Sequence, residues 1–394
     1  MHATRRKVFS GLTGVVAGLL MVTSAPVVAP AAAAGPSSVE LVGKGWGHGR
    51  GLSQYGAQNA AANHGRSYRQ ILDFYYPGTR VGRTSGSVRV RLTAATSRLL
   101  TVGARPGLRV RSVATGASVP LARTGARFWR IAERTGTPNS EVWVYTNDAG
   151  WKLVRHVGGQ AEFYVAGGTL RLHLPKGSAI YRGTLRSAEP AGGGARETVN
   201  VVSLEHYLRG VVPREVPATW HPQAVRAQAV AARSYAVFER NAVRSLPTPR
   251  HFDVWDTTRS QVYDGVLAEH PASNAAVTAT RGEVRLYDGR AAFTQFGSSN
   301  GGWTAAGSKT YLVAKKDAWD LWPGNPNRSW TKTITDDTIE KAYADIGDFQ
   351  RLELTHRQGR VVKANIVGSR DTVPVTGDQL RSALGLKSTV FSLA

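Results

Sequence analysis

The chain has 394 residues, with 50 lysines and arginines against 27 acidic residues, so its formal net charge is +23. It contains no cysteine, which excludes disulfides, thiol nucleophiles and zinc sites with cysteine ligands. The length allows two or three domains, and the charge favours a polyanionic partner, although an arginine-rich soluble chain without such a partner is the simpler interpretation.

The first 34 residues have the pattern of a secretory signal peptide. A basic start, Arg5-Arg6-Lys7, precedes a mostly apolar run over Val8–Ala29, and small residues ending at Ala34 offer a cleavage site. We therefore expect a secreted protein that keeps no membrane anchor; an uncleaved N-terminal membrane helix is the alternative. For an exported chain without a long lysine or arginine run, an anionic cell-wall polymer is a better partner than nucleic acid, and we expect no nucleic-acid binding.

Residues 35–83 are predicted to form a glycine-rich loop and two helices. GKGWGHGRGLSQYGA, over Gly43–Ala57, is dense in glycine around His48, which lets the backbone turn tightly and approach a ligand. It lacks the Gly-Lys-Ser/Thr ending of a phosphate loop. Capping residues and breakers predict the helices Ser53–Asn63 and Ser67–Tyr76.

Residues 84–182 have the pattern of a β-rich accessory region. SVRVRLT, LRVRSV, VWVYT and TLRLHL alternate apolar and polar residues with period two, and glycine, proline and asparagine separate them. The pattern predicts a small barrel or sandwich that braces the site or binds wall polymer; a purely structural role is the alternative.

The stretch Val201–Val243 holds the candidate for catalysis. Ser203 caps a first helix, and a long, alanine-rich helix follows with a proline in its first turn. Between the two helices, Pro213 and Pro217 restrict a loop that carries Glu215. This lone carboxylate is where we expect the chemistry.

Arg233 lies in the long helix among apolar neighbours. A buried guanidinium needs a partner, for which we expect Glu215 or a substrate oxygen. Further along the chain, periodicity and turn signals predict helices over 274–280 and 336–346, hairpins at 287–289 and 358–359, and a C-terminal helix stopped by Gly385.

Several blocks make this chain resemble the SpoIID/LytB family of bacterial cell-wall proteins, named after stage II sporulation protein D and the amidase enhancer. The blocks are VVSLEHYLRGVVPREVPATWHPQAVRAQAVAARSYA, FDVWDTTRSQVYDG, FTQFGSSNGGWT, VTGDQLRSALGLKSTVF and GWGHGRGLSQYGAQNAAANHGRSYRQILDFYYPGT. The resemblance implies an α+β fold, with a SpoIID-like catalytic domain over 183–394. In the family's usual order the block that contains Gly47-His48-Gly49, here called the GHG block, follows the segment that corresponds to Leu384–Phe391. Here it comes first, which indicates a circular permutation that returns 35–83 to the C-terminal segment and completes the catalytic domain.

The loop HFDVWDTTRSQVY corresponds to a segment through which some family members hold zinc by a histidine and two cysteines. Here His251 is present, but Trp255 and Ser260 stand at the matching positions, and neither is a credible zinc ligand. We therefore expect no metal and no cofactor, with aromatic packing and hydrogen bonds holding the loop.

The resemblance implies a lytic transglycosylase that cleaves peptidoglycan glycan strands, preferably strands without stem peptides, with Glu215 as its catalytic carboxyl. The C6 hydroxyl of muramic acid then replaces the second carboxylate of ordinary glycosidases. Because the carboxyl must be protonated near neutral pH, we expect burial to raise its pKa. We also expect that neither Arg214 nor Arg233 forms a bidentate pair with it.

Polar residues of the matching blocks are candidates for orienting sugars and N-acetyl groups: Arg233, Gln228, Gln261, Tyr263, Ser298, Ser299, His48, Gln54 and Tyr55. His48 is a candidate second proton carrier or a loop histidine bonded to backbone, and Gln228 and Arg233 are alternatively structural polar groups. Two other functions stay open. One is a non-catalytic wall-binding module that stimulates an N-acetylmuramoyl-L-alanine amidase; the other is a hydrolase that adds Asp253 or Asp256 to Glu215.

Overall fold

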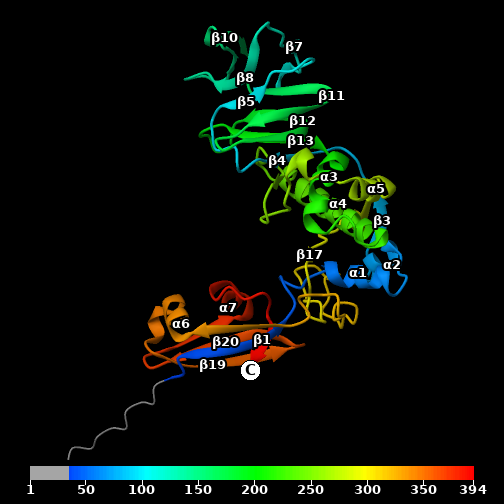
Figure 1. The fold of residues 1–394 in the computed structure, drawn as a ribbon, viewed down its shortest axis with the longest axis vertical. Helices are drawn as coiled ribbons and strands as arrows, with labels where there is room; N and C mark the ends of the chain where they lie inside the picture. Colours follow the sequence, from blue (N-terminus) through cyan, green and yellow to red (C-terminus); the bar gives the residue numbers. More distant parts are fainter. Residues whose placement is uncertain (1–34) are drawn as a thin grey trace, which may run out of the picture.

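A computed structural model describes residues 35–394, which form three tiers along the longest axis of the molecule (Figure 1). A large sheet lies at one end, helices lie in the middle, and smaller sheets with two short helices lie at the other end. The prediction of a mixed α+β fold is confirmed. The predicted signal peptide, residues 1–34, lies outside the described residues.

The first tier is a sheet of 11 strands in which nearly all neighbours are antiparallel. Alternation of apolar and polar residues builds much of it, because the apolar side chains of strands such as Ser87–Arg91 and Ser140–Thr146 face one buried side. The β-rich pattern predicted for 84–182 is present, and the sheet continues beyond it. Its strands are β4 (Ser87–Arg91), β5 (Leu100–Gly103), β6 (Arg109–Ser112), β7 (Ser118–Pro120), β8 (Ala126–Glu133), β9 (Ser140–Thr146), β10 (Gly150–Val157), β11 (Ala161–His173), β12 (Ser178–Ala188), β13 (Glu197–Ser203) and β14 (Val254–Trp255).

The middle tier is built on the long helix α4, which is alanine-rich and buried on most sides. One face, with Val225 and Ala229, belongs to the core of the large sheet, and another, with Ala227 and Val230, packs with α1 and α2. The elements of this tier are β2 (Leu52–Ser53), α1 (Gln54–Ala62), α2 (Tyr68–Tyr75), β3 (Arg80–Arg83), α3 (Leu204–Glu215), α4 (Pro222–Arg244), the 3-10 helix η1 (Gly265–Ala268), α5 (Pro271–Ala279), β15 (Glu283–Tyr287), β16 (Arg290–Ala291) and β17 (Phe296–Gly297).

Helix α3 follows β13 directly and departs from the prediction at its end. Ser203 caps it, as predicted, by accepting the N–H of His206. The expectation that Pro213 ends the helix is wrong: α3 continues through Pro213, and Glu215 is its last residue. Proline has no N–H to bond the carbonyl four residues earlier, so α3 loses one hydrogen bond in its last turn. Glu215 therefore stands on a helix end rather than in a loop.

The third tier joins the two ends of the described chain. Strand β1 lies between β18 and β22, so residues near 40 pair with residues near 392. The prediction that the N-terminal block returns to the C-terminal segment is confirmed, whereas the circular permutation stays a prediction. The elements are β1 (Ser38–Lys44), β18 (Trp330–Thr335), α6 (Asp336–Ala342), the 3-10 helix η2 (Ala344–Ile346), β19 (Phe349–Arg357), β20 (Arg360–Gly368), β21 (Thr372–Thr376), α7 (Gly377–Ala383) and β22 (Val390–Leu393).

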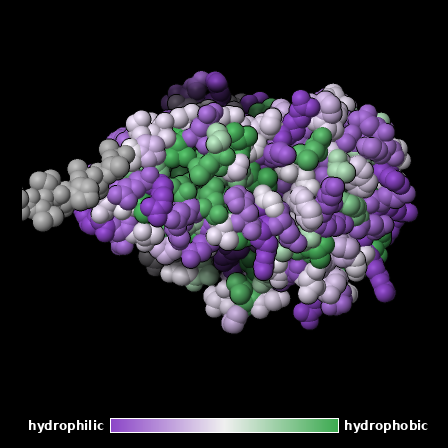
Figure 2. All heavy atoms as spheres, turned by 90° about the horizontal axis from the view of Figure 1, so that it is seen from below, coloured by the Kyte–Doolittle hydropathy of each residue, from purple (hydrophilic) through white to green (hydrophobic). Residues whose placement is uncertain are grey.

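Figure 2 views the molecule from the end that carries this third tier and shows apolar residues among polar ones on its surface. Exposed large apolar side chains of these strands are Val42, Val362 and Leu393. Within residues 35–394, no helix is both long and apolar enough to span a membrane.

Candidate functional site

Glu215 is a half-buried carboxyl at the junction of the N-terminal block and the SpoIID-like helices. The side-chain amide of Gln54, the first residue of α1, approaches it at 3.5 Å (Nε2 to Oε2), and the backbone N–H of Val262 also donates to it. Burial raises the pKa of Glu215 to about 7, while Val262, Gln54 and the charge of Arg214 lower it by less. The expectation of a raised pKa is confirmed.

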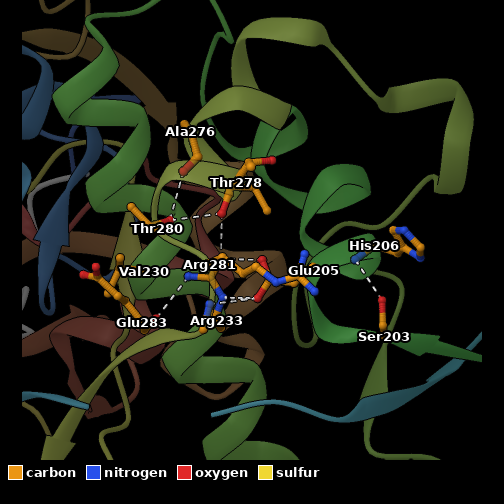
Figure 3. Close-up of polar contacts among 12 residues, drawn as sticks. Ser203, Glu205, His206, Val230, Arg233, Ala276, Thr278, Thr280, Arg281 and Glu283 are labelled. Atoms are coloured by element: carbon orange, nitrogen blue, oxygen red, sulfur yellow. Dashed lines mark hydrogen bonds and ion pairs between the residues drawn. The ribbon is translucent and has the colours of Figure 1, made fainter. Parts of the chain in front are cut away.

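Both arginines near Glu215 in the sequence are held by other acids. The Arg214 side chain pairs with Asp264 at 2.8 Å. The Arg233 guanidinium donates to both oxygens of Glu205 at 3.0 and 2.9 Å (Figure 3). Neither forms the bidentate pair that would keep Glu215 ionised, as we expected.

Arg233 requires a correction, because its partner is Glu205 and not Glu215. Its side chain is fully buried, and its remaining donors bond the backbone carbonyls of Glu283 and Val277 at 3.0 and 3.2 Å (Figure 3). From α4 the side chain reaches the first turn of α3, whereas Glu215 lies at the last turn. We therefore no longer assign Arg233 to substrate binding.

Four more predicted contact residues lie inside the fold. The Gln261 amide bonds Tyr207 and the carbonyl of Ala232, the Tyr263 hydroxyl donates to Asn200 at 2.8 Å, and the Ser299 hydroxyl donates to Asp320 at 2.8 Å. Gln228 is 1% exposed. Because these four side chains face the interior, we no longer assign them to a direct contact with sugars. Gln261, Tyr263 and Ser299 have structural contacts, whereas neither polar atom of the Gln228 amide has a hydrogen-bond partner within residues 35–394.

Three predicted residues form a series of contacts that begins at Glu215. Gln54 contacts it directly, and the backbone N–H of Tyr55 bonds the carbonyl of Ser298 at 3.1 Å. The Tyr55 ring lies edge-on to Trp220, with ring centres 5.0 Å apart. The Tyr55 and Ser298 side chains are half-buried, so they remain available to a ligand.

Asp320 fixes this arrangement. Its carboxylate accepts the hydroxyls of Ser53, the cap of α1, and of Ser299, together with the N–H of Gly301 at 2.8 Å. A buried carboxylate with several donors holds each in a defined place. These bonds connect the N-terminal block to the turn Ser298–Gly302, and Gln54 directly follows the bonded residue Ser53.

His48 lies in a separate cavity of about 300 Å³, which is also lined by Arg50, Arg360 and Asp378. Its Nδ1 accepts the N–H of Arg50 at 2.9 Å, which matches the alternative of a loop histidine bonded to backbone. Burial, followed by the charge of Arg50, lowers the pKa of His48 to about 4. The residues that contact Glu215 do not line this cavity, so the structure does not bring His48 to the carboxyl.

The loop that carries His251 is held by polar and aromatic contacts. His251 Nε2 lies 2.7 Å from a carboxylate oxygen of Glu197, and the hydroxyl of Ser260 accepts the N–H of Trp255 at 3.2 Å. The guanidinium of Arg259 stacks over the Trp255 ring, 4.3 Å from its centre. Among residues 35–394, no cluster of three or more histidine or acidic side chains could hold a metal ion. The absence of zinc and of a cofactor stays a prediction.

Sequence reasoning missed Asp320, Val262 and Tyr235. Tyr235 is half-buried on α4, bonds Ser260 and lies close enough to Glu215 for the carboxylate to raise the pKa of its hydroxyl, after burial as the main cause. A tyrosine in an alanine-rich helix was a usable signal. The backbone N–H of Val262 had none.

Comparison with known proteins defines the class. Residues 193–287 match the SpoIID family model, described as "Stage II sporulation protein". The chain therefore contains a SpoIID domain, as the resemblance implied, and this domain includes Glu215.

Individual relatives agree with this assignment. The chain is 35% identical over 145 residues to the amidase enhancer of Bacillus subtilis (strain 168), which covers 35% of this chain and 18% of that protein. It is 32% identical over 160 residues to stage II sporulation protein D of the same organism, covering 36% and 46%. With its counterpart from Bacillus amyloliquefaciens it shares 27% identity over 220 residues, covering 50% and 62%. The chain thus spans less than two thirds of the length of each.

Proposed function

We propose that this protein is a secreted peptidoglycan lytic transglycosylase that uses Glu215 as its single acid and base. The observation that carries the proposal is the state of this carboxyl: half-buried, without an arginine partner and with a pKa raised to about 7. Near neutral pH such a group is present in both protonation states, as a group that first gives and then takes a proton requires.

In this reaction the glycosidic oxygen must gain a proton, and the attacking hydroxyl must lose one. The Glu215 carboxyl donates a proton to the glycosidic oxygen as its bond to the anomeric carbon breaks. The C6 hydroxyl of the muramic acid that carries this anomeric carbon then attacks the carbon and gives its proton to Glu215. A 1,6-anhydro ring forms, no water is consumed and the carboxyl is restored.

The competing hydrolase needs a second carboxylate, and Asp253 is unsuitable for this role. Its side chain is fully buried between Arg89 and Arg244. Burial alone would raise its pKa, but hydrogen bonds from the two arginines outweigh burial and lower it. Asp256 accepts the backbone N–H of Thr93 at 2.9 Å, and no contact between Asp256 and Glu215 is seen within residues 35–394.

Tyr55 and Ser298 are the residues we propose for positioning the sugar, and the buried Gln54 positions the Glu215 carboxyl. Their arrangement supports a catalytic domain over 183–394 that residues 35–83 complete, with 84–182 as an accessory region. A permuted order of the GHG block is consistent with the contact between Gln54 and Glu215.

A second function is favoured by one comparison. The relative named amidase enhancer is 35% identical over 145 residues, so a non-catalytic protein that binds walls and stimulates an amidase is the alternative. Digestion of glycan strands without stem peptides, followed by mass spectrometry, separates the two. We expect anhydro-muramic ends from the wild type and none from Glu215→Gln. Intact glycan with both proteins, together with faster wall digestion by an added amidase, would establish the enhancer instead.

A further inference from the structure

A cavity of about 530 Å³ lies at the N-terminal end of α3, away from Glu215. Since α3 has 12 residues, a rise of about 1.5 Å per residue puts its two ends roughly 16 Å apart. The charged side chains that line the cavity are Arg83, Arg209, Arg281 and Glu205, with His206 beside them. Figure 3 shows Glu205, His206 and Arg281 around the first turn of this helix.

The positive charges of this cavity are not neutralised from within. Glu205 is its acidic residue, and both carboxylate oxygens already bond Arg233, while one also accepts the N–H of Gly282 at 3.1 Å. Among residues 35–394, Arg83, Arg209 and Arg281 form no ion pair. In the same part of the chain the buried Nε of Arg209 has no hydrogen-bond partner. The cavity therefore presents three guanidinium groups that pair with no acidic side chain within residues 35–394.

A second cavity of about 910 Å³ continues from the first and shares Arg83 and Thr84 with it. Its lining is largely apolar, with Phe238 and Leu286, and it contains a further cation, Arg290. The two cavities together form a groove in which arginines at both ends flank an apolar middle. We call it the arginine groove.

We propose that the arginine groove binds the phosphate groups of an anionic, phosphodiester-linked polymer of the cell wall. A phosphodiester shares one negative charge between two non-bridging oxygens, and each oxygen can accept hydrogen bonds from more than one guanidinium group. Three arginines around one cavity fit the phosphate, and the apolar middle accommodates the spacer to the next phosphate near Arg290. The proposal depends on the wall location proposed above and not on the chemistry of Glu215.

The test compares two pairs of substitutions that remove the same charge. Arg83→Gln with Arg281→Gln changes the groove, and both side chains are exposed, so the fold should be retained. Arg134→Gln with Arg370→Gln is the control, because these exposed arginines lie in the other two tiers. The probes are purified walls that carry a phosphodiester polymer and the same walls after hydrogen fluoride has removed it.

We expect the groove variant to sediment with intact walls at least about tenfold more weakly than the wild type in about 0.15 M salt, and the control variant to match the wild type. The wild type should bind stripped walls about tenfold more weakly than intact walls. Glu215→Gln should bind intact walls like the wild type. Equal weakening in both variants would reduce the effect to net charge and overturn the proposal. Undiminished wild-type binding to stripped walls would overturn the phosphate assignment, leaving carboxylates of the glycan as the ligand.

Discussion

The side-chain amide of Gln54 approaches the carboxylate of Glu215 from 161 positions away in the sequence. Gln54 begins α1, and Glu215 ends α3, so the contact joins the glycine-rich N-terminal block to the SpoIID domain. Asp320 sets this contact by binding the cap of α1 one residue earlier. The candidate site is therefore assembled from the N-terminal block, the SpoIID domain and the segment that follows this domain.

The first prediction concerns this contact. The Gln54 amide lowers the pKa of Glu215, so Gln54→Leu should raise that pKa and move the alkaline limb of the activity profile to higher pH. Loss of a positioning group should also reduce kcat, by roughly tenfold. The control is Gln58→Leu, one turn later on α1, whose side chain bonds the N–H of His221 instead. An unchanged pH profile in Gln54→Leu would show that the contact does not act on the carboxyl.

The second prediction is that Glu215→Gln stabilises the protein at alkaline pH but not at acidic pH. The folded-state pKa of Glu215, about 7, lies above the ordinary glutamate value of 4.5. Its favourable contribution is therefore complete below about pH 4.5 and is lost as pH rises to about 7. Glu215→Gln removes this loss, so at pH 8 it should be more stable than the wild type by about 1–3 kcal/mol, with little difference at pH 4. Denaturant unfolding at the two pH values measures this. Glu40→Gln, at an exposed position, should show no such pH dependence; a gain in Glu215→Gln that is equal at both pH values would refute the raised pKa.

The third prediction separates structure from catalysis at Arg233. Removing the guanidinium in Arg233→Gln leaves Glu205 and two buried carbonyls without their donor, which should cost about 3–5 kcal/mol. The double variant Arg233→Leu with Glu205→Gln should recover part of this loss. At a temperature where the single variant is folded, its pH profile should match the wild type. A normally stable Arg233→Gln protein with a raised KM would instead restore Arg233 to the substrate.

The fourth prediction tests the tie at Asp320. Asp320→Ala leaves the hydroxyls of Ser53 and Ser299 and the N–H of Gly301 without their shared acceptor, so stability should fall by about 2–4 kcal/mol. Hydrogen exchange should show faster opening of residues 43–62, because the N-terminal block loses its anchor. Asp345→Ala, an exposed control in the third tier, should change neither quantity. Unaltered exchange in Asp320→Ala would mean that other contacts hold the block.

The features that could be predicted from the sequence are those that depend on neighbouring residues. Ser53, Ser67 and Ser203 cap helices as predicted, and the hairpin at Asp288-Gly289 has both residues at positive φ. Such features depend on a few adjacent residues.

What could not be predicted depends on distant packing. Arg233 was expected to pair with Glu215 or a substrate oxygen because a buried guanidinium needs a partner, but a helix directs its residues to different faces, and Glu205 lies on the face that Arg233 meets. Pro213 was expected to end a helix that tertiary packing continues. The return of the N-terminal block was predicted from the resemblance to a family, and local sequence alone does not contain it.

The most direct test of the proposed reaction is digestion of glycan strands in water enriched in heavy oxygen. Because the C6 hydroxyl and not water attacks the anomeric carbon, the new ends should be anhydro-muramic and should carry no heavy oxygen, and Glu215→Gln should form none. Reducing ends that carry one heavy oxygen per cleavage would contradict a lytic transglycosylase and establish a hydrolase.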